Sequence, residues 1–219
     1  RPAAGGGAVT IAMHFPPEAA ATLTEIMRWR RDVRHFRAEP VPAPLLARLQ
    51  QAMELAPSVG NARPWRVLAV ESPALRAAVR TEFTRCNTQA AEIYEGEQVE
   101  AYARLKLAGL DNAPVQLAIF TDLTPQAGHG LGRQTMPETL EQSTAMAIHT
   151  LWLMARSENL GLGMLSILEP AAMEALFATP PGWRFSAYLC LGWPEFTDDT
   201  PLLHRQDWQH NTTMPWQKR

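Results

Sequence analysis

The segment from Glu138 to Asn159 constrains the fold most, because it carries the longest helical repeat of largely apolar side chains. On a helix the repeating residues share one broad face, formed by Leu140, Thr144, Ala147, Ile148, Leu151, Trp152 and Ala155. Gly161 follows at a position where a helix commonly ends. A face this broad is typical of a helix that is buried in the core or that packs against a second subunit, so we expect a long central helix.

Four apolar runs are expected to form strands. They span residues 66–70, 115–120, 162–168 and 185–193. The run at 115–120 is almost continuously apolar, which indicates a strand that is buried on both faces. Ser166 is the one hydroxyl residue of the run at 162–168.

The segments between these runs have the features of helices. Thr22 and Glu25 form a capping box, which predicts a helix from Thr22 to about Arg31. Pro44 is well placed in the first turn of a second helix, and residues 73–110 have a mostly helical pattern. Helices that flank a sheet of a few strands, with one long central helix, give an α+β fold.

The composition favours a single domain without a membrane span. Of the 219 residues, 46% are hydrophobic, and we expect residues 21–219 to bury one core after a Gly/Ala-rich flexible leader at 1–20. No apolar run reaches the ~20 residues that a membrane helix needs, and the net charge of −2 gives no general attraction to nucleic acids. Two cysteines are too few for a disulfide framework, so we expect a reducing, cytoplasmic location.

Residues 30–34 concentrate positive charge around one carboxylate, because Arg30, Arg31 and Arg34 enclose Asp32. Guanidinium groups present planar sets of donors that match phosphate oxygens, and they stay charged at any working pH. The segment ends a predicted helix, and the C-terminal end of a helix favours cations. It therefore predicts an anion site with one built-in base; the alternative is a solvent-exposed basic surface with one ion pair.

Other common site patterns are absent from the sequence. The six histidines lack the paired spacing of a metal site, and neither Ser58 nor Ser166 stands in the glycine-flanked setting of a nucleophilic serine. The glycine-rich loop at 128–132 is followed by Arg133, where the dinucleotide-binding pattern needs glycine. The remaining candidates for a site are the arginines, the polar loop at 58–61 and Ser166. Together they could hold a phosphorylated, planar cofactor with a polar edge.

Several longer motifs resemble the nitroreductase fold, and in particular its 5,6-dimethylbenzimidazole synthase branch. They read RRDVRHF, APSVGNARPW, GHGLGRQTMPETLEQST, LWLMARSENLGLGMLSIL and YLCLGWPE, and the resemblance covers Met27 to Glu195. It implies a mixed or antiparallel central sheet flanked by helices, in a homodimer of the domain-swapped type. Met164 and Gln142 stand where the branch is expected to have tryptophan and tyrosine, and Asn61 is nearer the general nitroreductase pattern.

The resemblance implies that reduced FMN is bound at the dimer interface as a substrate. Dioxygen would be the co-substrate, and the ring system would fragment to 5,6-dimethylbenzimidazole, the lower ligand of cobalamin. Erythrose 4-phosphate would be released. The electrons would come from a separate flavin reductase or from free reduced flavin.

The resemblance also assigns roles to residues of this chain. Asp32 would be the catalytic carboxylate, and Ser166, at the edge of the flavin ring, would aid the later oxidation steps. The arginines would hold the phosphate and the ribityl chain. The full set of expected flavin contacts is Arg30, Arg31, Asp32, Val33, Arg34, Ser58, Asn61, Leu105 and Ser166. Residues 85–104, called the lid below, would shield the site, and a C-terminal extension at 194–219, with Arg205 as a weaker phosphate candidate, would wrap a partner subunit.

Two other functions are compatible with the same fold. An NAD(P)H-dependent nitroreductase, quinone reductase or corrinoid reductase would recycle FMN and leave room for nicotinamide to stack on it. A flavin carrier would bind FMN and protect it without chemistry. Formation of 5,6-dimethylbenzimidazole from reduced FMN in air separates the synthase from both alternatives.

Overall fold

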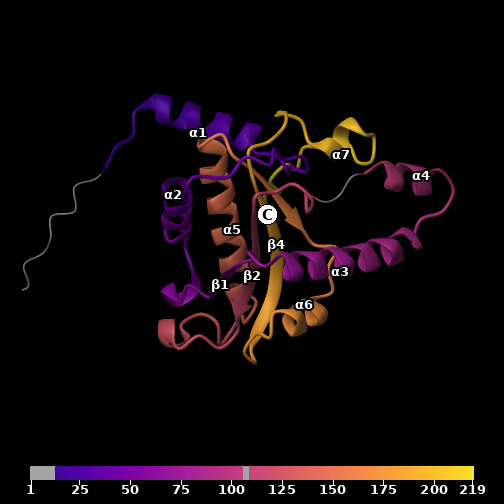
Figure 1. The fold of residues 1–219 in the computed structure, drawn as a ribbon. Coiled ribbons are helices and arrows are strands. Elements are labelled where there is room, and N and C mark those ends of the chain that lie inside the picture. The colour runs from indigo at the N-terminus through magenta and orange to yellow at the C-terminus, as the bar shows by residue number, and fades with distance from the viewer. Residues whose placement is uncertain (1–12, 106–108) are drawn as a thin grey trace, which may run out of the picture.

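The computed structural model describes residues 13–105 and 109–219, and it has the expected α+β architecture (Figure 1). In chain order, the elements are α1 (Pro17–Trp29), α2 (Ala43–Met53), η1 (Val59–Asn61), β1 (Trp65–Ala69), α3 (Pro73–Ala91), α4 (Glu97–Arg104), β2 (Val115–Asp122), η2 (Ala127–Gly130), α5 (Thr139–Ser157), β3 (Gly161–Leu165), α6 (Pro170–Leu176), β4 (Trp183–Gly192) and α7 (Leu202–Arg205). Among the described residues, no helix has both the length and the apolar character that crossing a membrane requires.

The strands form one antiparallel sheet in the order β1-β2-β4-β3. The central strands are β2 and β4, and the edges are β1 and β3. Beside β3, Asp32 pairs with Leu162 in a short parallel bridge. The expected central sheet is therefore confirmed as antiparallel, and the segment that carries Asp32 lies along one of its edges.

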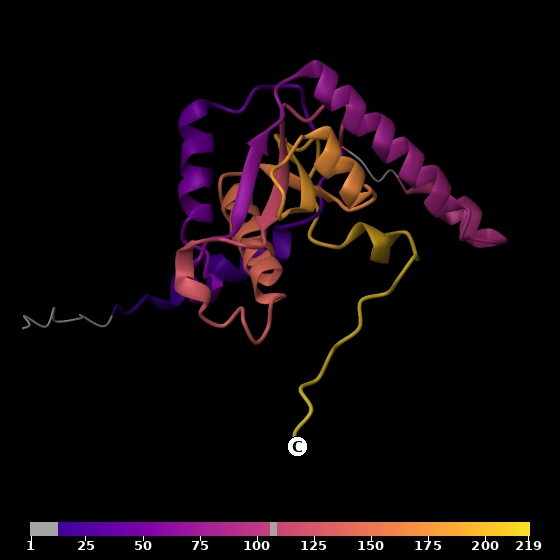
Figure 2. The same cartoon turned by 90° about the horizontal axis from the view of Figure 1, so that it is seen from below.

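Helices cover both faces of the sheet (Figures 1 and 2). On β4, the side chains of Ala187, Leu189 and Leu191 belong to a core that also contains α2 and α5. The intervening Tyr188 and Cys190 belong to a second core with residues of α3 and α6. This alternation is what a strand buried on both faces requires. The long helix predicted from its apolar face is confirmed as α5, which buries that face in the first core.

The first helix begins earlier than its sequence pattern predicts. It starts at Pro17, after an extended Pro16, and no capping box forms at Thr22. Proline suits the first turn of a helix because its missing N–H would have no partner there, so this start takes precedence over the one predicted at Thr22. Residues 17–20 are therefore helical and not part of a flexible leader, whereas residues 1–12 of the expected leader lie outside the described residues.

Two boundaries near β3 also differ from the predictions. Helix α5 ends at Ser157, and Asn159, not Gly161, adopts the left-handed conformation that follows it (φ 61°). Gly161 is instead the first residue of β3. The strand ends at Leu165, so Ser166 lies just beyond it and not within it.

Two glycines of β3 allow the chain at residues 32–33 to lie directly against the strand. The backbone N–H of Val33 donates a hydrogen bond to the carbonyl oxygen of Leu162 (3.1 Å). A Cβ atom at Gly163 would lie 2.2 Å from the carbonyl oxygen of Val33, and one at Gly161 would lie 2.8 Å from the Cγ2 atom of Val33. A side chain at either position would displace the segment, so the two glycines determine where Asp32 stands.

We expect Gly163→Ala to lower the free energy of unfolding by about 2 kcal/mol or more, because the new methyl group would overlap a backbone carbonyl group. Urea unfolding measures the change. Met164→Ala is the control: it changes the neighbouring residue of the same strand, whose side chain is 42% exposed, and adds no atom against residues 32–33. That substitution should cost about 1 kcal/mol or less. Equal effects of the two substitutions would contradict the close contact.

Candidate functional site

Asp32 is held in a fixed orientation at the edge of the sheet. Its Oδ1 atom accepts a hydrogen bond from the backbone N–H of Met164 (2.9 Å), and its Oδ2 atom accepts one from Nε of Arg34 (3.0 Å). The side chain of Arg34 is 12% exposed and that of Asp32 is 34% exposed. The carboxylate is therefore paired with a cation and still accessible, which suits a group that exchanges a proton with a ligand.

The two cysteines do not take part in this chemistry. Cys190 lies opposite Gly163 in the sheet, and its thiol is fully buried. Burial raises the pKa of Cys190 to about 12, and the negative charge of Asp32 acts in the same direction, so the thiol stays neutral. Cys86 is also free. Within residues 13–105 and 109–219, no group of three or more His, Cys, Asp or Glu side chains could hold a metal ion.

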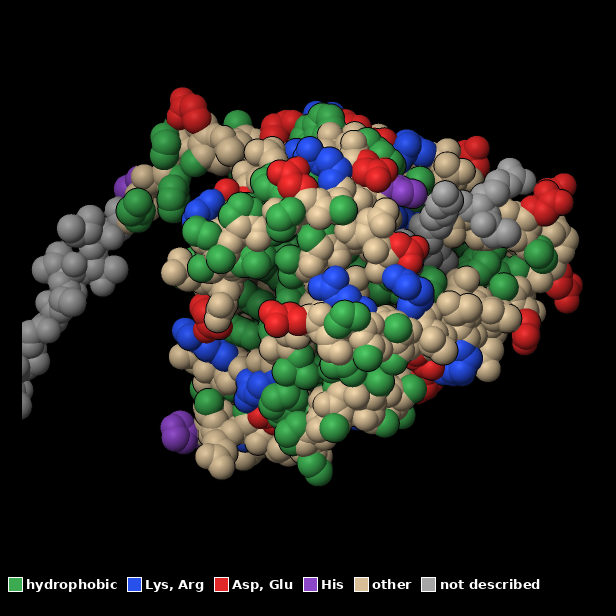
Figure 3. Space-filling view, viewed as in Figure 1, with side chains coloured by type: hydrophobic (Ala, Val, Ile, Leu, Met, Phe, Trp, Pro, Cys, Tyr) green, Lys and Arg blue, Asp and Glu red, His purple; other side chains and the backbone are tan. Residues whose placement is uncertain are grey.

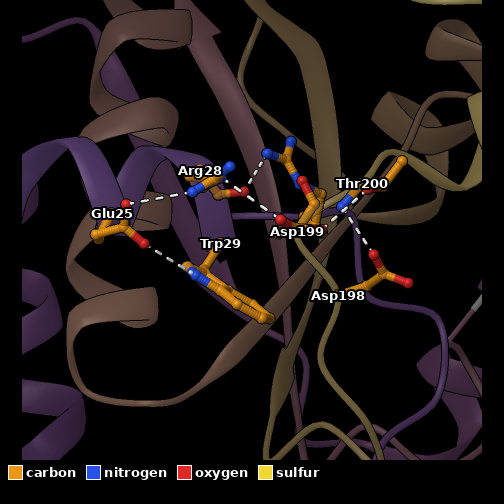
Figure 4. Close-up of polar contacts among 7 residues, drawn as sticks. Glu25, Arg28, Trp29, Asp198, Asp199 and Thr200 are labelled. Carbon is orange, nitrogen blue, oxygen red and sulfur yellow. Dashed lines mark hydrogen bonds and ion pairs between the residues drawn. The ribbon is translucent and has the colours of Figure 1, made fainter.

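Polar contacts bind the C-terminal extension to α1 and to Arg31 (Figure 4). Arg31 donates from Nε to the carbonyl oxygen of Asp199 (3.1 Å), and its guanidinium group also binds the carbonyl oxygen of Arg28. Arg28 in turn lies 3.5 Å from the carboxylate of Asp199 and 3.6 Å from that of Glu25. Burial lowers the pKa of Arg31 and the charge of Arg30 lowers it further, while Asp199 opposes both. The extension is thus held beside the arginine segment.

A cavity of about 300 Å³ opens beside Asp32. Its walls are residues 31–35, Leu105 at the end of α4, and part of the C-terminal extension from Phe196 to Gln206. Arg205, whose Nε lies 3.0 Å from Oδ2 of Asp198, adds a third guanidinium group to those of Arg31 and Arg34. Two carboxylates, of Asp32 and Asp198, also line the cavity, and that of Asp198 is paired with Arg205. The three guanidinium groups beside the carboxylate of Asp32 suit the recognition of phosphate oxygens next to a proton-exchanging group.

A second cavity, of about 420 Å³, adjoins the same segment. Arg30 lines it, with Cζ of its guanidinium group 4.7 Å from the ring centroid of Trp152. Trp152 also donates from Nε1 to the carbonyl oxygen of Arg31 (3.3 Å). Met164, whose N–H binds Asp32, lines this second cavity. The bonded pair Asp32–Met164 therefore separates the two cavities.

Ser166 is exposed just beyond the end of β3. It stands two residues after Met164, whose backbone holds Asp32. Ser166 lines neither of the two cavities as the described residues form them. Of the two residues predicted to be catalytic, Asp32 therefore lines the first cavity, whereas Ser166 is exposed beyond the end of the strand.

Ser58 and Asn61 lie elsewhere in the chain, and neither lines the two cavities as the described residues form them. The N–H of Val59 binds Oγ of Ser143 (3.0 Å) near the start of α5, whereas Trp152, nine positions further along α5, binds the segment of Asp32. At ~1.5 Å per residue, these two attachment points are ~13 Å apart along the helix. Within one chain, the loop at 58–61 therefore lies away from the first cavity, which is lined by Arg31, Asp32, Val33, Arg34 and Leu105 among others.

The glycine-rich loop at 128–132 packs on the loop at 58–61. A Cβ atom at Gly128 would lie 2.8 Å from the carbonyl oxygen of Gly60, and one at Gly132 would lie 2.8 Å from Cγ2 of Val59. Both glycines also have positive φ angles, of 79° and 81°. These glycines therefore allow two loops to meet, which is a different use from the binding of a dinucleotide.

The comparison with known proteins decides the family. The model of the nitroreductase family matches residues 27–193. The chain belongs to the nitroreductase family. Within this family, the 5,6-dimethylbenzimidazole synthase of Rhodobacter capsulatus is 60% identical over 207 residues, which are 94% of this chain and 100% of that protein. The protein of the same name from Rhodospirillum rubrum is 47% identical over 205 residues, which are 94% of this chain and 97% of that protein. The resemblance inferred from the motifs is confirmed.

Solved structures of nitroreductase-fold proteins agree with the fold. An iodotyrosine deiodinase bound to FMN and 3-iodo-L-tyrosine has a TM-score of 0.67 and 25% identity, and the match covers 80% of this chain and 91% of that one. A nitroreductase with bound FMN from Desulfitobacterium hafniense has a TM-score of 0.60 and 19% identity over 80% of this chain and 90% of that one. The second likeness concerns the fold alone.

The contacts of Trp152 and of the Met164 backbone could not be predicted from the sequence. Trp152 belongs to the predicted apolar face of the central helix, but it is partly exposed and lies under the guanidinium group of Arg30. Met164 holds Asp32 through a backbone N–H, which every residue except proline would supply, so no sequence pattern marks it.

We expect Asp32→Ala to lower the free energy of unfolding by about 1–2 kcal/mol, because it removes the acceptor of the Met164 N–H and the carboxylate beside Arg34. Asp32→Asn should cost less, since its amide oxygen can still accept the first of these bonds. Urea unfolding checks the order of the two variants.

The control for this pair is Asp111→Asn, at a carboxylate that is 77% exposed and paired with Arg80. It should change the free energy of unfolding by less than about 0.5 kcal/mol. Equal losses in both Asp32 variants would mean that these hydrogen bonds do not hold the segment in place.

Proposed function

We propose that the chain forms 5,6-dimethylbenzimidazole, the lower ligand of cobalamin, by fragmenting reduced FMN with dioxygen and releasing erythrose 4-phosphate. The observation that carries the proposal is the fixed carboxylate of Asp32 in a cavity that also holds Arg31, Arg34 and Arg205. The named synthases of Rhodobacter capsulatus and Rhodospirillum rubrum, which match this chain over almost its whole length, support the same reaction.

The residues present suit FMN. The guanidinium groups of the first cavity, of about 300 Å³, match a phosphate monoester, and the second cavity, of about 420 Å³ around Arg30 and Trp152, lies on the other side of the Asp32–Met164 pair. Together the two cavities fall within the size of ~300–1,000 Å³ that is usual for small-molecule sites. When bound in its reduced form, FMN supplies both the carbon skeleton of the product and electrons for dioxygen.

Asp32 is the group that moves protons in this proposal. The N–H of Met164 and Nε of Arg34 each take one of its oxygens, and a carboxylate has about four acceptor positions, so others remain for a ligand. It can accept a proton from a bound molecule and return it without changing its own orientation. The arginines hold the phosphate and the ribityl chain, and Ser166 offers a hydroxyl group to the edge of the ring.

The lid and the C-terminal extension keep water away from the reacting atoms in this proposal. Leu105 contributes a buried apolar side chain to the cavity wall, and the extension contributes Phe196 and Leu202. Exclusion of water matters because reduced flavin that reacts with dioxygen in bulk solvent yields hydrogen peroxide and intact oxidised flavin. A separate flavin reductase, or free reduced flavin, would supply the electrons.

We propose further that the site is completed in a homodimer of the domain-swapped type. Helix α1 buries none of its residues, and the outer side of α5 leaves Met146 41% exposed. The last residues run away from the body of the chain in Figure 2, and Trp216 among them is 98% exposed. Apolar surfaces of this kind are typical of subunit contacts. The loop at 58–61, which is apart from Asp32 within one chain, would reach the flavin from the second copy.

We expect Met146→Asp to turn a dimeric protein into a monomer and to weaken FMN binding by at least about tenfold, because it would bury a charge in the contact between subunits. Light scattering and flavin fluorescence measure the two effects. Ala171→Asp is the control: this position on α6 is exposed in the first turn of a helix, where a negative charge is tolerated. A wild-type protein that is monomeric in the presence of FMN would contradict the dimer.

We expect the wild-type protein, mixed with reduced FMN in air, to form 5,6-dimethylbenzimidazole, which chromatography detects. Asp32→Asn should still bind FMN but lose product formation by at least about a hundredfold, because an amide cannot accept the proton. Asp111→Asn, far less buried and paired with Arg80, should keep the wild-type rate.

Three results of this assay would count against the proposal. A wild-type reaction that gives oxidised FMN and hydrogen peroxide without product would refute the synthase. NADH oxidation with nitroaromatic compounds in that case would indicate a reductase. Product formation by Asp32→Asn at the wild-type rate would remove the role assigned to Asp32.

A further inference from the structure

An aromatic cluster of Tyr94, Tyr102 and Trp208 joins the lid to the C-terminal extension. Tyr94 stacks on Tyr102, with ring centroids 4.8 Å apart and 30° between the planes. Trp208 meets Tyr94 edge to face at 5.3 Å and 81°, and its centroid is 6.2 Å from that of Tyr102. These are separations at which aromatic rings attract one another. Tyr94 and Tyr102 belong to the lid, whereas Trp208 follows α7.

Each ring is fixed on its own segment by further contacts. The hydroxyl group of Tyr102 donates to Oδ1 of Asn87 on α3 (2.7 Å). Burial raises the pKa of Tyr102, so its hydroxyl group keeps its proton and remains a donor. The N–H of Trp208 donates to the carbonyl oxygen of Leu203 in α7 (3.0 Å). A movement of either segment would therefore carry its ring along.

Each of the two joined segments adjoins the wall of the Asp32 cavity, which is lined by Leu105, directly after the lid, and by part of the C-terminal extension. The N–H of Leu105, a wall residue, binds the carbonyl oxygen of Tyr102 (2.9 Å). Arg205, a wall residue on the other segment, stands three positions before Trp208 and pairs with Asp198. The cluster thus lies next to one wall residue in each segment.

Helix α4 is set apart from the body of the protein. Its described backbone comes close to that of α3 and to no other helix or strand. Figure 1 shows α3 and α4 projecting from the body, with α7 beside α4. Figure 3 shows acidic side chains gathered at the outer end of this arm, where Glu92, Glu95 and Glu97 are exposed to solvent. The ring contacts with Trp208 thus attach this arm to the extension.

We propose that Tyr94, Tyr102 and Trp208 are positioning residues that keep the cavity closed and thereby set the residence time of the bound nucleotide. The inference rests on the proposed function only in taking FMN as the ligand. While the rings are in contact, Leu105 and Arg205 stay in place on their two walls. When the rings separate, the walls move apart and the nucleotide dissociates.

The rate of dissociation of oxidised FMN from the full-length protein tests this proposal, and flavin fluorescence after dilution measures it. Trp208→Ala removes both ring contacts of Trp208 and should speed dissociation on the order of tenfold. Trp208→Phe retains an aromatic ring and should restore most of the wild-type rate. Ile93→Ala is the matched control, because it removes an apolar side chain of the lid next to Tyr94 that is 78% exposed, and it should leave the rate unchanged.

Hydrogen exchange of residues 97–104 without flavin gives a second readout, which does not depend on nucleotide binding. Exchange should be faster in Trp208→Ala and unchanged in Ile93→Ala. Tyr94→Ala should speed FMN dissociation as well, and combining it with Trp208→Ala should add less than the sum of the two single effects, because the rings act on each other.

An unchanged dissociation rate in Trp208→Ala, equal rates in Trp208→Ala and Trp208→Phe, or additive effects in the double variant would overturn the proposal. If Trp208→Ala does not fold, the FMN dissociation rates of Trp208→Phe and Tyr94→Ala test the proposal instead. A wild-type protein that binds FMN without forming 5,6-dimethylbenzimidazole would refute the proposed function and leave this measurement valid.

Discussion

The packing of residues 32–33 against β3 is the contact on which the rest of the site depends. It requires glycine at two positions of the strand, because any Cβ atom at Gly161 or Gly163 would overlap Val33. It also brings the carboxylate of Asp32 to the backbone N–H of Met164. Since β3 pairs with β4, which is buried between two cores, the position of Asp32 is set by a strand that is anchored to the core of the sheet. A reactive group on such a support keeps its geometry better than one on a loop.

The charges around this contact are organised in pairs before any ligand arrives. Arg34 is paired with Asp32, and Arg205 with Asp198, while Arg31 binds the carbonyl oxygen of Asp199. These partners hold the guanidinium groups in position, so less side-chain conformational entropy is lost when a phosphate binds. Of these contacts, the one between Arg31 and Asp199 ties the C-terminal extension to the site, so the same arginine can take part in recognition of the nucleotide and in closure of the cavity.

The sequence predicted the elements well where the pattern was local. Short stretches of sequence were enough to predict the apolar face of α5, the strands β2 and β4, and the cluster of arginines around Asp32. The contacts that assemble the site are not local: Asp32 meets Met164, and Arg30 meets Trp152, across more than a hundred residues. Residue spacing alone does not assign Asp32 and Ser166 to one site. That assignment comes from the resemblance of the longer motifs to a known family. The role of Ser166 stays a prediction, and its place beyond β3 follows from the early end of that strand.

A crystal structure of the wild-type protein with FMN, grown without oxygen, would show whether β3 positions the carboxylate of Asp32 beside the flavin. We expect the flavin phosphate among the guanidinium groups of residues 30–34, the ring next to Asp32, and an intact bond from the N–H of Met164 to Asp32. A separate cavity of about 680 Å³ is lined by residues of α2, β1 and β2. A flavin bound in that cavity, or an Asp32 side chain turned away from the ring, would contradict this arrangement.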